Sequence, residues 1–181
     1  MRLSRSSIDL TISTFAGLLS APLALAIGLL IKLESPGPVI ISRQRVGKNG
    51  QRFAHYRFRT MAGSPLQKTR FGRFIGNLSL DDIPTLWNVL RGDMSLVGPR
   101  PEVPEKVDLN NPIWQKILSV RPRIMGLGLV TFLDRYNQAP IVERIRPELY
   151  YVEHQSLWFD LKLILVSLYY WLRSGHLKGK V

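Results

Sequence analysis

The chain has 181 residues, a formal net charge of +12, 45% hydrophobic residues and no cysteine. The absence of cysteine excludes disulfides, thiolate zinc sites and cysteine nucleophiles, and the hydrophobic content excludes a disordered basic tail. A chain of this length forms one domain with a substantial core. Its charge predicts anionic partners: nucleic acid, phospholipid headgroups or phosphorylated substrates.

The first expected element is an apolar helix. Residues 10–31 contain no charged residue, and a run of this length can cross a bilayer. Pro22 lies in the middle of the run and predicts a kink, and the small Ala21 beside it permits a sharp bend. Basic residues flank both ends, which favours cytoplasmic placement of both. A re-entrant helix is therefore favoured over a spanning helix. A cleaved signal peptide is disfavoured, because the apolar run continues past the small residues 24–26.

A β-hairpin is expected after the helix. Residues 35–38 (Ser-Pro-Gly-Pro) are a strong breaker. Short apolar or alternating runs at 39–41 and 52–58 indicate strands, and the Gly-Lys-Asn-Gly turn at 47–50 lies between them. The alternation in the second strand places the side chains of Arg57 and the residue two positions later on one face.

The region 79–91 is predicted to be a single helix. Ser79 is a candidate N-cap, and Asp81 and Asp82 occupy the first turn. Pro84 is tolerated near a helix start, which fixes where this helix begins.

The remaining elements are weaker predictions. We expect a basic loop at 61–73, a rigid turn at 97–101, a helix from Pro104 or Pro112 to about Val120, a strand at 127–132, and helices at 142–155 and 157–173. Aromatic residues at the ends of the last helix suit either a membrane interface or a packed core. The chain is thus predicted to be an α+β protein with interfacial amphipathic helices.

The acidic pair Asp81-Asp82 has two readings. Acids in the first turn of a helix usually only complement the macrodipole. However, a helix N-terminus also suits a phosphate, and basic residues such as Arg70, Arg91 and Arg100 surround the pair in sequence. An ionised carboxylate can attack phosphorus. A divalent cation, with Mg²⁺ the best match for oxygen ligands, would offset the repulsion between the two anions.

A long signature surrounds this pair. Residues 79–101, Ser-Leu-Asp-Asp-Ile-Pro-Thr-Leu-Trp-Asn-Val-Leu-Arg-Gly-Asp-Met-Ser-Leu-Val-Gly-Pro-Arg-Pro, closely resemble the signature of the bacterial sugar transferases known as monotopic phosphoglycosyl transferases. Residues 31–39, 43–47 and 56–61 resemble further blocks of that family, so the resemblance covers roughly residues 2–173.

The resemblance implies a two-step reaction on a membrane surface. It implies a re-entrant helix over residues 1–33, and a catalytic domain over 34–181 on the cytoplasmic face of the bacterial inner membrane. Asp81 would take a phosphosugar from a UDP-sugar with release of UMP, and polyprenyl phosphate would then attack the intermediate. Asp82 would assist with Mg²⁺ or with proton transfer. Five arginines are candidate phosphate-binding residues: Arg57, Arg70, Arg91, Arg100 and Arg121.

The chain departs from the family pattern in several places. The second acid is usually Glu and here is Asp82, the basic residue before Phe58 is usually Lys and here is Arg57, and the Ser-Pro kink is here Ala-Pro. The largest departure lies at 123–133, where Arg123, Met125 and Leu129 replace the usual Gly, Thr and Gln. The replaced groups are candidates for contact with the nucleotide or the sugar, so the departures bear on substrate recognition.

Two other function classes stay open at this stage. The departures at 123–133 are compatible with a catalytically weakened membrane scaffold, and the charge alone suggests a nucleic-acid binder. No recognised nucleic-acid motif supports the second. The resemblance implies UDP-sugar, polyprenyl phosphate and membrane phospholipid as partners, without nucleic acid. The sequence names neither the sugar nor the oligomeric state, and it is compatible with a homo-oligomer.

Overall fold

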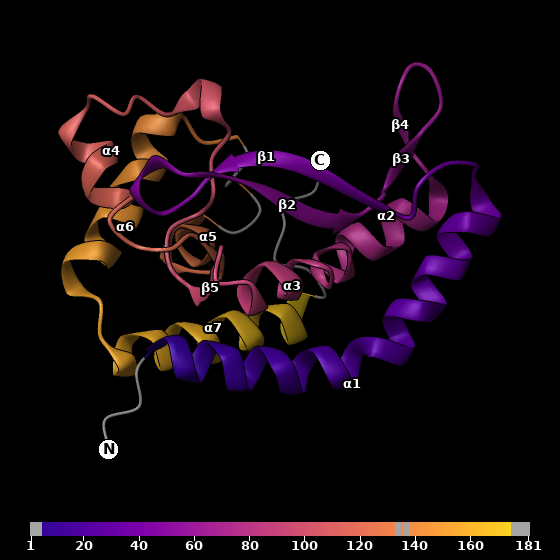
Figure 1. Ribbon diagram of the computed structural model, residues 1–181, viewed down its shortest axis with the longest axis horizontal. Coiled ribbons are helices and arrows are strands. Elements are labelled where there is room, and N and C mark those ends of the chain that lie inside the picture. The colour runs from indigo at the N-terminus through magenta and orange to yellow at the C-terminus, as the bar shows by residue number, and fades with distance from the viewer. Residues whose placement is uncertain (1–4, 133–134, 136–137, 175–181) are drawn as a thin grey trace.

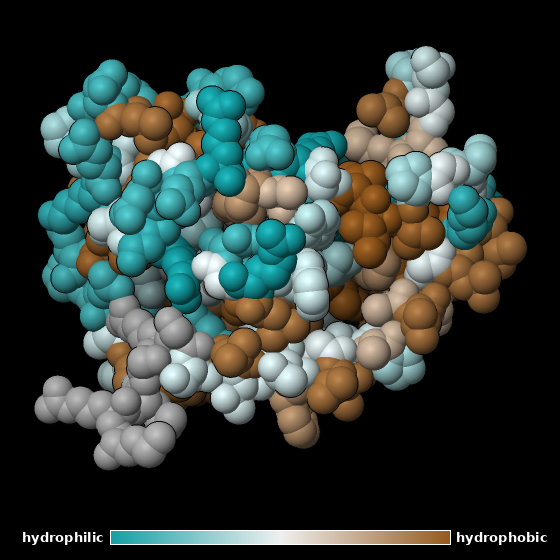
Figure 2. All heavy atoms as spheres, viewed as in Figure 1, coloured by the Kyte–Doolittle hydropathy of each residue, from teal (hydrophilic) through white to brown (hydrophobic). Residues whose placement is uncertain are grey.

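The structure is a computed structural model that describes residues 5–132, 135 and 138–174 (Figure 1). Helix α1 runs from Arg5 to Glu34 with Pro22 inside it, and Figure 1 shows that the helix bends along its length. Among the described residues it is the one helix long and apolar enough to cross a membrane, with a mean hydropathy of 2.1 and 11% of its most apolar window buried. Hydrophobic residues gather at the lower right edge in Figure 2, over the part of α1 that turns upward. This exposure distinguishes α1 from the core helix of a soluble protein.

The end of α1 is fixed by Arg59. Its guanidinium donates to the carbonyl oxygens of Pro36 and Ser35 at 2.6 and 2.7 Å. Gly37 has a φ of +118°, and a Cβ there would lie 2.2 Å from Arg59 Nη1. Only glycine permits both this backbone conformation and this close approach. The expected breaker at 35–38 is therefore confirmed, with a long-range arginine holding it in place.

The predicted hairpin is confirmed. Strands β1 (Ile40–Val46) and β2 (Arg52–Phe58) pair antiparallel and are joined by a 3₁₀ turn at Lys48–Gly50. Arg57 lies within β2 opposite Ile41, whereas Arg59 comes after the strand ends. The two arginines expected on one strand face therefore have different partners.

The expected loop at 61–73 is wrong. This stretch contains a second hairpin, β3 (Met61–Ala62) and β4 (Gln67–Lys68), and the start of helix α2 (Arg70–Asn77). Thr69 caps α2 by accepting a hydrogen bond from Gly72 N at 2.9 Å. A Cβ on Gly72 would lie 2.2 Å from the Thr60 carbonyl oxygen, so the backbone of Thr60 packs directly against this glycine. This contact organises the segment, and its basic composition gave no sign of it.

The single helix expected at 79–91 is divided in two. Ser79 has a left-handed φ of 58° and makes no side-chain cap, and a 3₁₀ turn at Leu80–Asp82 precedes helix α3 (Thr85–Leu90). Pro84, which lacks an N–H, stands directly before α3. The acidic pair therefore lies in a tight turn of its own rather than in the first turn of α3.

The strand expected at 127–132 is also wrong, because these residues form helix α5 (Leu127–Phe132). A short apolar run does not distinguish a strand from a buried helix. The third sheet instead pairs β5 (Ser95–Val97) with β6 (Arg123–Met125) in parallel. The remaining helices are α4 (Pro112–Ile117), α6 (Ile141–His154) and α7 (Leu157–Ser174), with a 3₁₀ turn at Pro104–Lys106.

Two hydrophobic clusters hold the fold together. The first joins α3 and β5 to α6 and α7 through residues such as Met94, Tyr151 and Leu163. The second joins the later part of α1 to β2 and α2 through Ile31 and neighbouring residues. The described residues therefore combine helices with small two-stranded sheets, of which β1–β2 and β5–β6 pack against helices, and this confirms the α+β prediction.

Candidate active site

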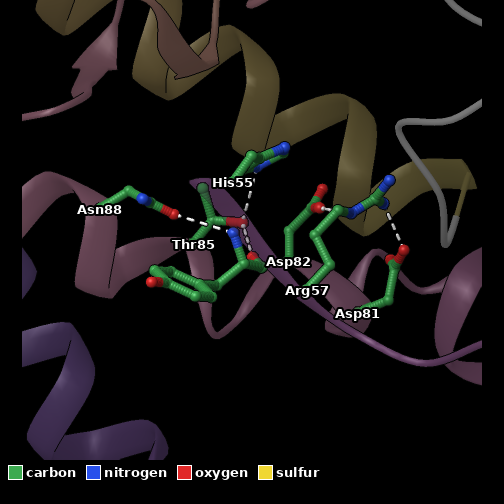
Figure 3. A network of polar contacts seen from close by, with 7 residues as sticks. His55, Arg57, Asp81, Asp82, Thr85 and Asn88 are labelled. Atoms are coloured by element: carbon green, nitrogen blue, oxygen red, sulfur yellow. Dashed lines mark hydrogen bonds and ion pairs between the residues drawn. The ribbon is translucent and has the colours of Figure 1, made fainter. Parts of the chain in front are cut away.

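The acidic pair meets one arginine. Arg57, on β2, lies between the carboxylates of Asp81 and Asp82 in Figure 3. Its Nη2 donates to Asp81 Oδ2, and its Nε forms an ion pair with Asp82 Oδ1 at 2.6 Å. Asp81 is 5% exposed, so its charge depends on this partner. The tight turn at Leu80–Asp82 thus presents both carboxylates to a single cation.

The ion pairs stabilise the charged forms of all three groups. Burial alone would lower the pKa of Arg57, but the carboxylates of Asp82 and Asp81 outweigh burial and hold that pKa above its ordinary value. Reciprocally, a guanidinium beside a carboxylate favours the ionised carboxylate. The ionised carboxylate is the form that a nucleophile requires.

A buried hydrogen-bond network fastens α3 to β2 and so positions the acidic turn. Asn88, with no exposed surface, accepts from Tyr56 N at 3.1 Å and donates to the Ala54 carbonyl at 2.8 Å. Thr85 donates to the Tyr56 carbonyl at 3.0 Å, so its oxygen is an acceptor for His55 Nε2 at 3.1 Å. His55 was absent from the predicted site residues, and the spacing of Thr85 and Asn88, three residues apart on α3, is the signal that could have indicated this network.

A cavity of about 280 Å³ is lined by Asp82 and by Arg57, the partner of both acids, whereas Asp81 is not among its lining residues. Four arginines line it: Arg45, Arg57, Arg100 and Arg123. Burial, and then the neighbouring charge of Arg100, lower the pKa of Arg45. Such crowding of like charges is relieved by an anionic ligand. Arg45 was absent from the predicted site residues, although its position in the 43–47 block could have suggested it.

Several polar atoms at this cavity have no hydrogen-bond partner among the described residues. Among them are Arg45 Nε, Ser79 Oγ, Arg123 Nε and Ser167 Oγ. Buried polar groups are normally satisfied, and several exceptions around one cavity require an explanation. The simplest is a polar ligand that supplies the missing partners.

Apolar side chains also line the cavity. Met125, Leu129, Leu168 and Trp171 line it, and the indole of Trp171 is fixed by donating to the Leu78 carbonyl at 2.8 Å. The lining of the cavity therefore combines cationic and hydrophobic side chains, a composition that suits amphipathic phosphates.

Only some of the predicted arginines meet at the cavity. Arg57 and Arg100 line it, whereas Arg70 begins α2, and Arg91 is exposed and pairs with Asp93 at 3.6 Å. Arg121 lines a different cavity of about 410 Å³ between α1, β5 and α7. Phosphate contacts by these last three arginines stay predictions.

The donor set at the acids fits Mg²⁺. Among the described residues there is no cluster of three or more metal-ligating side chains. Mg²⁺ is nevertheless commonly bound by one or two carboxylates together with substrate phosphates. Asp81 and Asp82 already direct oxygens at one cationic centre, so they could supply that pair of carboxylates.

Comparisons with known proteins identify the family of this chain. The family model described as "Bacterial sugar transferase" matches residues 1–174. The chain is 35% identical over 91% of its length to a UDP-N-acetylgalactosamine-undecaprenyl-phosphate N-acetylgalactosaminephosphotransferase of Aeromonas hydrophila, of which it spans only 42%. It is 36% identical over 90% of its length to a UDP-glucose:undecaprenyl-phosphate glucose-1-phosphate transferase of Caulobacter vibrioides, spanning 67% of that protein. It is 31% identical to the exopolysaccharide production protein ExoY of Rhizobium meliloti, spanning 84% of it. The chain therefore belongs to the bacterial sugar transferase family.

Proposed function

We propose that this protein transfers a sugar 1-phosphate from a UDP-sugar to polyprenyl (undecaprenyl) phosphate, as the first membrane step of glycoconjugate synthesis such as that of an exopolysaccharide. The observation that carries the proposal is the acidic pair Asp81 and Asp82 on one arginine, Arg57, with Asp82 and Arg57 lining a cationic cavity. The relatives whose names describe such transfers support it.

The proposed chemistry has two displacements at one phosphorus. A carboxylate oxygen of Asp81 attacks the β-phosphorus of the donor, the bond to the α-phosphate oxygen breaks, and UMP leaves with that electron pair. An oxygen of polyprenyl phosphate then attacks the same phosphorus, and the Asp81 carboxylate is the leaving group. The products are polyprenyl-diphosphate-sugar and regenerated enzyme.

The arginines supply most of the electrostatic stabilisation. Arg45 and Arg100 line the cavity and can hold the diphosphate, since guanidinium groups match phosphate oxygens in geometry and charge. Arg57 can pass from the carboxylates to the transferring phosphoryl group as charge moves. Mg²⁺ bound by Asp81 or Asp82 would neutralise the diphosphate charge.

The proposed membrane arrangement is re-entrant, with the catalytic domain on the cytoplasmic face. Near the start of α1, Asp9 accepts hydrogen bonds from Ser95 Oγ and Leu96 N at 2.7 and 3.3 Å. The other end of α1 is held by Arg59. A helix that crossed the bilayer would separate its ends by the membrane thickness. Contacts of both ends with one catalytic unit therefore favour placement of both on the same side, and side-specific labelling of the two ends tests this.

Donor-dependent UMP release tests the proposed reaction. Purified protein is incubated with polyprenyl phosphate, Mg²⁺ and a panel of UDP-sugars, and we expect UMP from at least one donor. Asp81→Asn should abolish both turnover and the covalent adduct detected by mass spectrometry. Asp108→Asn, a change at an exposed carboxylate outside the cavity, is the matched control and should retain activity. An active Asp81→Asn variant would refute the nucleophile assignment, and no UMP from any donor would favour the non-catalytic scaffold.

A further inference from the structure

A stripe of large apolar side chains runs along one side of α7 and connects the two cavities. It consists of five residues at alternating spacings of four and three, Leu157, Leu161, Ile164, Leu168 and Trp171. This spacing keeps the five side chains on one side of a helix. The first three residues line the cavity of about 410 Å³, and the last two line the cavity of about 280 Å³ that is also lined by Asp82. The α7 stripe therefore leads from one cavity to the other.

The α7 stripe is not buried as a core stripe would be. Leu157, Leu161 and Leu168 are 48%, 47% and 46% exposed, whereas Leu163 on another side of the helix is 3% exposed. Apolar residues at this spacing normally pack against another element of the protein or a partner helix. Here each of the three leucines lines a cavity and also keeps nearly half of its surface accessible. The stripe is therefore accessible to an apolar ligand along its length.

The acids of the 410 Å³ cavity are satisfied within the protein. Asp160 accepts a hydrogen bond from the Tyr151 hydroxyl at 2.7 Å, and Asp9 accepts from Ser95 Oγ and Leu96 N. Carboxylates that already accept hydrogen bonds do not require a cationic ligand. Ile8 and Ile12 of α1 line the same cavity together with the first part of the α7 stripe. These two isoleucines and the stripe offer an apolar chain a continuous surface.

The charge at the other end of the α7 stripe selects the kind of ligand. In the proposed reaction the donor diphosphate occupies the arginine-lined cavity first, and polyprenyl phosphate enters it after UMP has left. With its phosphate at these arginines, the acceptor has Leu168 and Trp171 beside it in the same cavity. A ligand with an anionic head and a long apolar tail therefore matches the charge of this cavity and the stripe that leads out of it.

We propose that the α7 stripe binds the isoprenoid chain of the acceptor, with the first units at Trp171 and Leu168 and later units at Leu161 and Leu157. The inference rests on the proposed function and assigns the chain-binding surface to α7. Residues 157 and 171 are 14 positions apart, which is about 21 Å along a helix or the length of roughly four isoprene units. Recognition should therefore depend on chain length up to about four units.

Acceptors of different length test the proposal. UMP release is measured in detergent with geranyl phosphate, which has two isoprene units, and with geranylgeranyl phosphate, which has four. Leu161→Asn should lower kcat/KM about 5- to 10-fold for the longer acceptor, because a leucine contact with the chain is lost, and should leave the shorter one unchanged. Leu168→Asn should lower kcat/KM for both acceptors. Both positions are exposed, so the Tm should stay near that of the unaltered protein.

The matched control lies on the same helix outside the α7 stripe. Trp158 is 76% exposed and lines neither cavity, so Trp158→Gln tests general contact of α7 with detergent or lipid. This variant should keep the length preference of the unaltered protein. Equal losses for both acceptors in Leu161→Asn, or the same loss in Trp158→Gln, would overturn the proposal. A fall in oligomer mass in Leu161→Asn with an unchanged length preference would also overturn it, because the stripe would then bind a second copy of the chain.

Photolabelling separates this inference from the proposed reaction. Geranylgeranyl phosphate with a diazirine at the end of its chain is photolysed with the full chain, and labelled peptides are mapped by mass spectrometry. The label should appear on the start of α7 or on α1 near Ile8 and Ile12, and undecaprenyl phosphate should compete better than phosphatidylglycerol. If no donor releases UMP but this pattern is present, the reaction is refuted and the chain-binding surface stands. Labelling elsewhere, or equal competition by the two lipids, overturns the surface even if the protein is active.

Discussion

Replacement of Arg57 by methionine should destabilise the protein, and Mg²⁺ should partly reverse the effect. The substitution keeps much of the apolar side chain but leaves two carboxylates facing one another. Removing one partner of a buried ion pair costs about 3–5 kcal/mol. The side chains of Arg57 and Asp82 are 27% and 21% exposed, so solvent screens part of this cost. A loss of about 3 kcal/mol is expected, which lowers the Tm of a chain of this size by about 6–12 °C.

The reversal follows from binding linkage. Without Arg57, Asp81 and Asp82 can bind a divalent cation in its place, and Mg²⁺ at ten times its Kd stabilises the folded state by about 1.4 kcal/mol. Thermal melts in detergent, with and without Mg²⁺, should therefore show a recovery of about 3–6 °C for Arg57→Met and a smaller shift for the unaltered protein. Arg43→Met, at an exposed position of β1, is the matched control. An unchanged Tm for Arg57→Met, or equal Mg²⁺ shifts for both proteins, would refute the reasoning.

Two further predictions concern the support of the site and its membrane attachment. Asn88→Ala removes the hydrogen bonds to Tyr56 and Ala54 and should lower the free energy of unfolding by about 2–4 kcal/mol. Urea unfolding measures this change, with Asn77→Ala at an exposed position as the control. A smaller loss than that of the control would contradict the prediction. Leu25→Asp, at a position 77% exposed on α1, should weaken membrane attachment by about 3 kcal/mol. Flotation with vesicles tests the second prediction, and undiminished flotation would show that this face does not contact lipid.

Local signals predicted the elements that have strong boundaries. The β1–β2 hairpin followed from its glycine turn, and the end of α1 followed from the proline and glycine residues at 35–38. Elements fixed by long-range contacts could not be predicted. The β5–β6 pair joins segments 28 residues apart through the register Ser95↔Arg123 and Val97↔Met125, and nothing in either short segment specifies the other. Helix α5 was mistaken for a strand because its apolar residues gain their environment from α6 and α7.

The candidate site shows the same division. Asp81 and Asp82 were predicted from their signature, but their contact with Arg57 was not, because it depends on how the 3₁₀ turn packs against β2. Sequence proximity suggested Arg91 as a phosphate ligand, yet its side chain pairs with Asp93 at the surface. Arg45, distant in sequence from the acids, lines the cavity instead.

The contact between Arg57 and Asp82 links two departures from the family pattern. The longer, forked side chain of Arg57 reaches both carboxylates, and Nε lies only 2.6 Å from Asp82 Oδ1. A glutamate at 82 would push its carboxylate into this guanidinium. A lysine at 57 ends in a single ammonium group, which lacks the separate Nε and Nη2 donors that hold the two aspartates. Asp82→Glu and Arg57→Lys should therefore each lower kcat/KM.

The double variant should be more active than the product of the two single effects predicts. A coupling of about 1–2 kcal/mol, or roughly 5- to 30-fold in kcat/KM, lies in the range found for residues in direct contact. The four proteins of the cycle are compared by UMP release and by Tm, so that a loss of folding is not mistaken for a loss of chemistry. Effects that multiply would mean that the arginine and the short acid act independently. Recovery in the double variant would mean that residues 57 and 82 act as one unit, in which an arginine at 57 requires the shorter aspartate at 82 and a lysine requires the longer glutamate.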